Sequence, residues 1–269
     1  MRPPPGRLVL LGHPVVHSLS PAFQNAALRS ARIPLVYETV DTPPDRLQST
    51  LLALVDQDAA GNITLPHKAA AARMCDRRTA LAERVGAVNT FWIDDGVLVG
   101  DNTDVEGFLA LLDSVCGTGT QPRTIALLGA GGGAAAVLAA IGSREPRTVR
   151  VYGRDARRVD ALCARFRDMA RPATTAAEAV AGADLVINAT PVGLSSDDHP
   201  VDLALVQADA AIIDLVYRVG ETSWVRGARR RGHPAADGLV MLLEQGALAF
   251  ERWFGIVPDR AAMRAAVAR

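Results

Sequence analysis

The chain has 269 residues, of which 49% are hydrophobic and 22% charged, a composition typical of a globular protein with a full core. Basic and acidic residues number 29 each, so the formal net charge is zero and gives no support for a nucleic-acid partner. The arginines at 226, 229, 230 and 231 are interpreted as the solvated face of one helix. The length favours one large domain or two modest domains.

The three cysteines, Cys75, Cys116 and Cys163, are odd in number and share no metal-ligand spacing, a pattern typical of reduced cytoplasmic cysteines. The segment 1–6 lacks the apolar core of a signal peptide. The most apolar run, residues 125–141, contains four glycines and is short for a membrane span. These features predict a cytoplasmic protein without a membrane partner.

Strand and helix signals alternate over the first hundred residues. The apolar run 8–11 predicts a buried strand, and Ser20-Pro21 predicts the N-cap and first position of a helix through about Arg29. Strands are also expected over 36–40, 62–65, 87–93 and 97–99, the last two as a pair around Asp94-Asp95-Gly96. Helices are expected from Pro43 to about Val55 and from Pro66 onward.

The second half shows a more regular alternation. Residues 101–104 lead into a helix to about Val115, and the turn-rich segment 117–122 is interpreted as a linker. Strands are expected over 124–128, 148–152, 185–189 and 211–216, and helices over 134–141, 155–167 and from Asp237 to the end. This order predicts parallel strands with helical crossovers, in a dinucleotide-type domain that begins near residue 110. We expect the C-terminal helices to return to the first domain.

The string Gly129-Ala-Gly-Gly-Gly-Ala134 follows a predicted strand and opens a predicted helix, which fits the dinucleotide fingerprint. The first glycine permits a tight turn, the second lets the backbone approach a pyrophosphate, and Ala134 allows close packing of helix on strand. The helix N-terminus adds free N–H groups and a partial positive charge. The alternative is a tight glycine turn that binds no ligand.

The residues at the end of the second strand of this domain determine the preference for NAD or NADP, because an acidic residue there favours NAD and arginine favours NADP. The chain reads Gly153-Arg154-Asp155, with Arg158 one turn further on. Arg154 and Arg158 could hold the 2′-phosphate with paired donors. Asp155 either caps the next helix or holds the ribose hydroxyls, so NADP is favoured and NAD stays an alternative.

Five polar segments recur at predicted strand or helix ends, which indicates a binding site more strongly than any one residue does. Ser18 and Ser20 face one way if extended, although Ser20 could simply cap a helix. Asn62 and Thr64 share that spacing, Asn89 ends an apolar stretch, and Asn102, Thr103 and Asp104 cluster, with a cap again the alternative for the last two. Lys68, one turn into the helix after Pro66, is either a solvated charge or a proton donor, and in the second case Asp104 is the carboxylate that could hold the lysine ammonium. His17 and His67 have no partner at metal-ligand spacing, so no metal site is expected.

The chain resembles the shikimate dehydrogenase family over nearly its whole length. The matching strings, in order, are His17-Ser-Leu-Ser-Pro21, Asn62-Ile-Thr-Leu-Pro-His-Lys68, Ala87-Val-Asn-Thr90, Gly100-Asp-Asn-Thr-Asp104, Gly129-Ala-Gly-Gly-Gly133, Asn188-Ala-Thr-Pro-Val-Gly193, Asp214-Leu-Val-Tyr217 and Asp237-Gly-Leu-Val-Met241 with Gln245. The resemblance implies an α/β fold with an N-terminal substrate domain, residues 1–108 completed by helices over 238–269. A Rossmann-type NAD(P)-binding domain with a parallel sheet, residues 109–237, lies between them in the sequence.

The resemblance also implies a role for each matching position. Lys68 and Asp104 would form the catalytic pair. The substrate ligands would be Ser18, Ser20, Asn62, Thr64, Asn89, Tyr217 and Gln245, together with Asp104. The cofactor site would comprise Asp76, Gly129, Ala130, Gly131, Gly132, Gly133, Arg154, Asp155, Arg158, Leu215 and Gly238.

Several positions depart from the family pattern. Asp155 stands where a threonine is usual, Gln24 where a histidine is common, and Val240 where a glycine is usual. Glu244 precedes Gln245, and Thr222-Ser223 replaces a frequent Thr-Pro. None of these changes removes a catalytic group, but together they allow a paralogue that acts on quinate or an amino-substituted shikimate.

The predicted function is the reversible NADPH-dependent reduction of 3-dehydroshikimate to shikimate, in the chorismate and aromatic amino acid pathway. The partners would be small molecules, and a homodimer is the assembly considered. A second hypothesis is a cofactor-binding regulator that kept the fold without turnover; the intact Lys68 and Asp104 argue against it.

Overall fold

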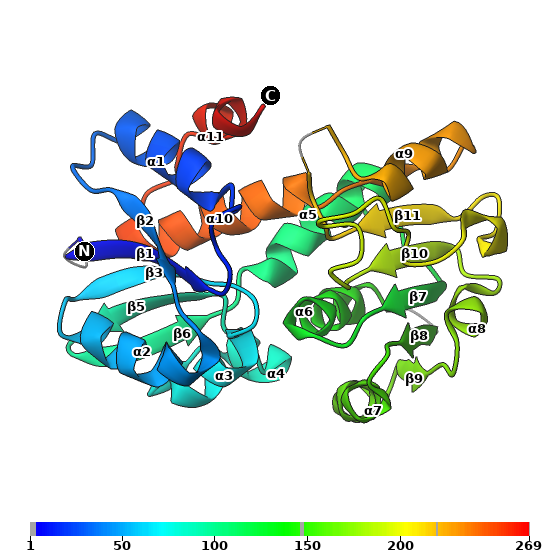
Figure 1. The fold of residues 1–269 in the computed structure, drawn as a ribbon, viewed down its shortest axis with the longest axis horizontal. Helices are drawn as coiled ribbons and strands as arrows, with labels where there is room; N and C mark the ends of the chain where they lie inside the picture. The colour runs from blue at the N-terminus through cyan, green and yellow to red at the C-terminus, as the bar shows by residue number, and fades with distance from the viewer. Residues whose placement is uncertain (1–3, 146–147, 219, 269) are drawn as a thin grey trace. The chain divides into compact units, whose positions relative to one another are not determined.

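A computed structural model describes residues 4–145, 148–218 and 220–268 (Figure 1). The chain divides into two compact units, the first made of Met1–Asp104 and Leu242–Arg269 and the second of Val105–Met241. Each unit is built on one six-stranded sheet. Within the described ranges, no helix is long and apolar enough to cross a membrane.

The sheet of the first unit is mixed, with strand order β2-β1-β3-β5-β6-β4. Its strands are β1 (Arg7–Gly12), β2 (Tyr37–Asp41), β3 (Ala59–Ile63), β4 (Arg77–Arg78), β5 (Thr90–Asp94) and β6 (Val97–Asp101). Strand β1 pairs parallel with β2 and β3, whereas β5 pairs antiparallel with β3 and β6. The predicted strand pair is confirmed, and its turn residues Asp95 and Gly96 have φ of 52° and 76°, as a two-residue hairpin requires.

Helices cover both faces of this sheet. They are α1 (Ser20–Ser30), α2 (Leu47–Val55) after a short 3-10 turn η1 (Pro44–Arg46), α3 (Lys68–Met74), α4 (Ala80–Val85), the later part of α10 (Leu239–Phe254) and α11 (Arg260–Val267). In Figure 1, α2 and α3 lie on one face, and their apolar residues join a buried cluster with β1, β3 and β5. Helices α1, α10 and α11 lie on the other face, where α11 packs against α1.

The sheet of the second unit is parallel throughout, with strand order β12-β11-β10-β7-β8-β9. Its strands are β7 (Thr124–Leu128), β8 (Thr148–Tyr152), β9 (Ala170–Pro172), β10 (Leu185–Asn188), β11 (Ala211–Asp214) and β12 (Ala235–Ala236). The chain winds one way from β7 through β8 to β9, then returns to β10 on the other side of β7. This is the doubly wound order, and ligands of such sheets bind beyond the carboxyl ends of the strands at the reversal, here between β7 and β10.

The helices of the second unit are α5 (Asp104–Cys116), which begins at the last residue of the first unit's N-terminal segment, α6 (Gly132–Ile141), α7 (Ala156–Arg165), α8 (Ala176–Val180) and α9 (Ser223–Arg230). Short 3-10 turns, η2 (Gly142–Arg144) and η3 (Leu203–Leu205), complete the unit. Residues 134–141 of α6 are all buried, and their five alanines let the helix lie close to the sheet. Figure 1 shows α6 and α8 on opposite faces of this sheet.

Three predicted helix ends are wrong. In helix α1, Leu19 occupies the N-cap position without a side-chain cap, and Ser20, whose amide donates to the Ser18 hydroxyl, is the first helical residue. Helix α3 begins at Lys68 with His67 as its N-cap, so Lys68 lies at the helix start. The C-terminal helix is interrupted after Phe254, where Gly255 takes a φ of 67° and Asp259 caps α11.

Candidate active site

Lys68 and Asp104 form an ion pair inside the first unit, with 2.7 Å between Lys68 Nζ and Asp104 Oδ2. Lys68 opens α3 soon after β3, and Asp104 opens α5 soon after β6. The side chain of Asp104 is 4% exposed and that of Lys68 is 19% exposed, so the ammonium is the partner that solvent or a ligand can reach. An ion pair this buried is stable only where further hydrogen bonds complete it.

Asn89 supplies the hydrogen bond that completes the pair. Its Nδ2 donates to Asp104 Oδ1 at 2.9 Å, and it also lies 3.0 Å from Thr103 Oγ1 and 3.1 Å from Gln245 Oε1. An amide nitrogen carries two hydrogens, so these three oxygens share two donors. Because Asn89 Oδ1 accepts from the Thr103 amide at 2.8 Å, both ends of this buried side chain are fixed.

Asn62 holds the backbone of Asn89 through a hydrogen bond. Its Nδ2 donates to the Asn89 carbonyl at 3.1 Å, while its Oδ1 accepts from the Tyr37 hydroxyl at 2.8 Å. These contacts give Asn62 a clear structural task, the support of the Asn89 backbone. A direct contact of Asn62 with substrate stays a prediction.

Ser18, Ser20 and Thr64 lie on the segments that follow β1 and β3. These strands are parallel neighbours, with Leu11 opposite Ile63, so their carboxyl ends lie side by side. The Thr64 amide donates to the Leu11 carbonyl at 2.8 Å and ties the two segments together. The serine pair and Thr64 therefore lie on segments that leave the sheet at the same end, and Ser20 does not serve as a cap.

The Asp101 carboxylate anchors the segment that leads to Asp104, a role that was not predicted from the sequence. Asp101 is 3% exposed, and its Oδ1 accepts from the Asn102 amide at 2.8 Å and from the Thr79 hydroxyl. Its Oδ2 accepts from Arg252 Nε of α10 at 2.9 Å. Asp101 thus anchors the segment that carries Asp104, and its position inside the polar string 100–104 was the signal available for it.

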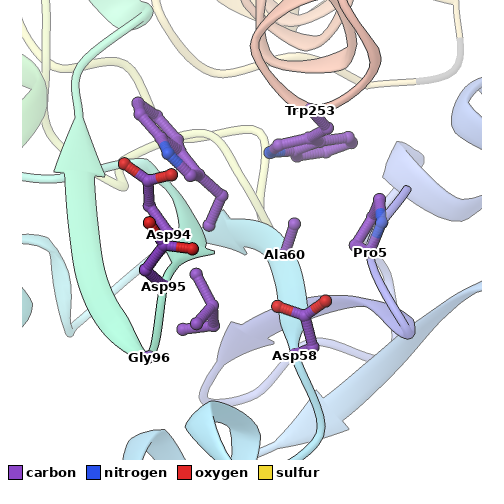
Figure 2. A pocket seen from close by; sticks show the side chains of 9 residues that line it. Pro5, Asp58, Ala60, Asp94, Asp95, Gly96 and Trp253 are labelled. Carbon is purple, nitrogen blue, oxygen red and sulfur yellow. The ribbon is translucent and has the colours of Figure 1, made fainter. Parts of the chain in front are cut away.

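A separate hollow of about 180 Å³ opens elsewhere in the first unit (Figure 2). Trp92 and Trp253 form its walls, and Asp58 and Asp95 line it. None of the predicted site residues lines this pocket, so it is not the place where the candidate chemistry occurs.

In the second unit, the glycine turn leaves open space at the start of α6. Gly129 has φ of 117°, and a Cβ there would lie 2.6 Å from the Ala189 carbonyl oxygen. Gly131, the N-cap of α6, would place a Cβ in open space within the part of the chain that is described. Backbone N–H groups at this helix start are therefore accessible to an anion, and the residues present fit a dinucleotide.

The structure gives Asp155 the capping role. Asp155 Oδ1 accepts from the amides of Arg157 and Arg158 at 3.1 and 3.3 Å, which caps α7. Its second oxygen lies 3.3 Å from Arg158 Nε. Arg154, just after β8, and Arg158, in the first turn of α7, are both exposed, so the local charge is cationic and suits a 2′-phosphate.

A buried polar network holds the segments that follow β10 and β11. Asp214 is fully buried and accepts from Asn188 Nδ2 at 2.8 Å, the Val216 amide at 3.1 Å and the Thr222 hydroxyl at 2.9 Å. Burial raises the pKa of Asp214 from 3.8 to about 6, against the lowering effect of these hydrogen bonds. The network was not predicted, although Asn188 and Asp214 begin two of the strings quoted above.

Two further cofactor positions lie near this network. A Cβ at Gly238 would come within 2.3 Å of the Leu215 carbonyl oxygen, and one at Gly133 would lie 3.5 Å from Leu215 Cδ1.

Two other predicted ligands lie in different units. Tyr217 belongs to the second unit and is half-buried. Asp76 belongs to the first unit, where its carboxylate accepts from the Leu98 amide at 2.9 Å. Their ligand roles stay predictions.

Three family models match consecutive parts of the chain. The shikimate dehydrogenase substrate binding domain matches residues 10–91, the shikimate / quinate 5-dehydrogenase model matches residues 113–195, and the shikimate 5′-dehydrogenase C-terminal domain matches residues 238–268. The substrate-domain match contains Lys68 and Asn89, and the second match contains the glycine turn.

Individual relatives match over almost the entire chain. A shikimate dehydrogenase (NADP(+)) of Methylobacterium radiotolerans is 40% identical, over 94% of this chain and 92% of its own length. The crystal structure of shikimate 5-dehydrogenase from Thermus thermophilus in complex with NADP(H) and shikimate is 38% identical, with a TM-score of 0.84 over 97% of this chain and 98% of that one. Quinate dehydrogenase from Corynebacterium glutamicum in complex with NAD is 28% identical, with a TM-score of 0.86 over 96% and 97%. Together with the site geometry, these matches show that the chain belongs to the shikimate dehydrogenase family.

Proposed function

We propose that this protein catalyses the reversible NADPH-dependent reduction of 3-dehydroshikimate to shikimate. The observation that carries the proposal is the buried Lys68–Asp104 pair, completed by Asn89 and Gln245, in a chain of this family. A reduction of a ring ketone needs a proton donor at the carbonyl oxygen and polar groups that orient the ring. The first unit contains candidates for both among the residues that the sequence singles out.

Residues 1–108 with 238–269 would form the substrate and catalytic domain, and residues 109–237 the cofactor domain. The parallel, doubly wound sheet and the glycine turn of the second unit support the cofactor assignment. The ion pair and the polar segments of the first unit support the substrate assignment.

When bound, NADPH supplies the hydride. Negative charge then develops on the carbonyl oxygen of the substrate, and Lys68 donates a proton to that oxygen. Asp104 orients the ammonium through the 2.7 Å contact and accepts a hydrogen bond from the neighbouring substrate hydroxyl. General acid help of this kind accelerates reactions by roughly 10²–10⁴-fold.

The other polar residues would hold the ring. Ser18, Ser20 and Thr64 follow neighbouring strands β1 and β3, Asn89 donates to Asp104, and Gln245 accepts from Asn89. These five would bind the carboxylate and the remaining hydroxyls. Asn62 would act through its support of Asn89, and Tyr217 is proposed as a further substrate ligand.

The cofactor would be NADP, held by residues 129–133 at the pyrophosphate and by Arg154 and Arg158 at the 2′-phosphate. The capping role of Asp155 supports this choice, because the carboxylate already accepts two backbone hydrogen bonds. Leu215, Gly238 and Asp76 would line the nicotinamide end. NAD is the alternative that a direct comparison tests.

The reaction would belong to the chorismate and aromatic amino acid pathway. We place the enzyme in the cytoplasm because Cys75, Cys116 and Cys163 are all free thiols, and burial raises the pKa of Cys75 to about 11, which keeps it unreactive. A homodimer is proposed as the assembly and is tested by light scattering.

The decisive experiment assays the purified protein with shikimate, quinate and aminoshikimate, each with NADP⁺ and with NAD⁺, following reduced cofactor by absorbance. The highest kcat/KM is expected for shikimate with NADP⁺. A preference for quinate or aminoshikimate would identify the paralogue considered above. Binding of cofactor without turnover of any of the three would favour a regulator.

A further inference from the structure

Gln24 is a polar side chain buried completely within the first unit. Its Nε2 donates to the Gly246 carbonyl of α10 at 2.9 Å. Its Oε1 is buried and meets no hydrogen-bond donor among the described residues. A buried amide oxygen without a donor costs more free energy than an ordinary hydrogen bond contributes, so such oxygens normally bind water or a ligand.

The orientation of the Gln24 amide is determined by its partner. Gly246 presents a carbonyl oxygen, and an amide turned the other way would place two acceptors against each other. The unpaired atom is therefore the oxygen. The Gln24 nitrogen donates to one neighbour while its buried oxygen accepts no hydrogen bond among the described residues. This arrangement indicates that a second group, a hydrogen-bond donor, binds to the oxygen.

Ser20 lies one helical turn before Gln24 on the same face of α1. Helical side chains lean toward the helix N-terminus, so Gln24 leans over the turn that Ser20 occupies. Ser20 is 5% exposed, and its hydroxyl is not used as a helix cap, because Leu19 holds that position. The Ser20 hydroxyl is therefore available for hydrogen bonds at this face.

On its other side, Gln24 contacts α10 directly beside a second proposed substrate ligand. Gly246 follows Gln245, whose Oε1 accepts from Asn89. A Cβ at Gly246 would lie 2.4 Å from the Phe23 ring and 3.2 Å from Gln24 Nε2, so α1 and α10 approach closely here. Gln24 thus connects the helix that carries Ser20 to the turn of α10 that carries Gln245.

We propose that Gln24 is a positioning residue of the substrate site that acts through Ser20 and Gln245. Its Nε2 fixes the α10 backbone at Gly246. Its Oε1 accepts one hydrogen of a buried water whose other hydrogen goes to Ser20 Oγ. Ser20 then keeps its own O–H to donate to the substrate. The inference rests on the proposed function, in which Ser20 and Gln245 bind shikimate.

Two substitutions at Gln24 separate positioning from packing. Gln24→Met keeps the length but removes donor and acceptor, and the KM for shikimate should rise about 3- to 10-fold, the effect of one lost hydrogen bond. The kcat and the KM for NADP⁺ should stay within about twofold of wild type, because neither the proton donor nor the cofactor site is touched.

Gln24→His is the matched control, since a neutral imidazole also offers one N–H donor and one nitrogen acceptor. Its KM for shikimate should be near the wild-type value above a pH of about 6.5 and rise below it, where both nitrogens carry protons and the acceptor is lost. The wild type should show no such rise of its shikimate KM below this pH. In the histidine variant, the KM for NADP⁺ should not rise with the KM for shikimate.

An unchanged shikimate KM in Gln24→Met would overturn the proposal, as would equal rises in the KM of shikimate and NADP⁺ together with a lowered Tm. A pH-independent shikimate KM in Gln24→His would also overturn it, and this variant alone decides if the methionine variant does not fold. Failure of the proposed function would look different, because the wild-type protein would then not turn over shikimate at all.

Discussion

Replacement of Lys68 by methionine tests the proton donor directly. Methionine matches the length of the lysine stem and removes only the ammonium. If Lys68 protonates the developing oxyanion, kcat should fall roughly 10²–10⁴-fold, which corresponds to about 3–5 kcal/mol of lost transition-state stabilisation. The KM for shikimate should change much less, because Ser18, Thr64 and Asn89, which we propose as ligands of the ring, are unchanged.

The structure also predicts a stability cost for this variant. Asp104 is 4% exposed, and without the ammonium at 2.7 Å its carboxylate would keep only the hydrogen bonds from its neighbours. Removal of one partner of a buried pair typically destabilises a protein by about 3–5 kcal/mol. The double variant Lys68→Met/Asp104→Asn removes the unpaired charge, so it should recover most of the lost unfolding free energy.

This recovery is the control that separates chemistry from folding. Turnover is measured by cofactor absorbance with saturating shikimate and NADP⁺, and stability by urea denaturation of the same preparations. The double variant should be nearly as stable as wild type and as inactive as Lys68→Met. A kcat within about threefold of wild type in a folded Lys68 variant would refute the assigned role, since general acid catalysis contributes far more than that.

Three other substitutions test the cofactor unit. Arg154→Ala should raise the KM for NADP⁺ about 10- to 100-fold, as expected for charge-assisted hydrogen bonds, and leave NAD⁺ unaffected; equal losses with both cofactors would contradict the phosphate assignment. Asp155→Ala should lower the unfolding free energy by about 1 kcal/mol through the lost cap without reversing the preference for NADP⁺. A stronger preference for NADP⁺ over NAD⁺ in this variant would instead indicate that Asp155 contacts the ribose. Asp214 has its pKa raised from 3.8 to about 6 in the folded state, so its protonated form favours folding and stability should decline as the pH rises through this range. The decline should total about 3 kcal/mol. Urea denaturation of Asp214→Asn should lack this part of the pH dependence, and an identical decline in the variant would assign it to other groups.

The elements that sequence predicted well are those whose signals are local. Strand β7, the glycine turn and α6 follow one another in a single apolar pattern, and the hairpin of β5 and β6 is marked by Asp95-Gly96. Strand β3 begins three residues earlier than predicted because Ala59, Ala60 and Gly61 have little strand propensity of their own. They are extended because β1 pairs with them, and a Cβ at Gly61 would lie 2.0 Å from the Val9 carbonyl oxygen.

The candidate site shows the same division. The polar strings could be recognised because each interrupts an apolar stretch, and the structure brings Lys68, Asn89, Asp104 and Gln245 into one hydrogen-bonded group. Which member supports another could not be predicted, since Asn62 and Asn89 are chemically identical side chains in similar strings. Only the contacts distinguish Asn89, which donates to the Asp104 carboxylate, from Asn62, which donates to the Asn89 backbone carbonyl.

The site of the first unit also depends on residues that the sequence places far away. Asn89 lies 156 residues before Gln245, and Asp101 lies 151 residues before Arg252, yet both pairs are hydrogen-bonded. Helix α10 therefore completes the support of Asp104 at two points, once through the Asn89 amide and once through the Asp101 carboxylate. The whole second unit lies between these partners in the chain, so the hydrogen bonds from α10 are added to a group whose other members, Lys68, Asn89 and Asp104, all lie in the N-terminal segment. The Lys68–Asp104 pair is separated by only 36 residues, and α10 supports it indirectly, through Asn89 and Asp101.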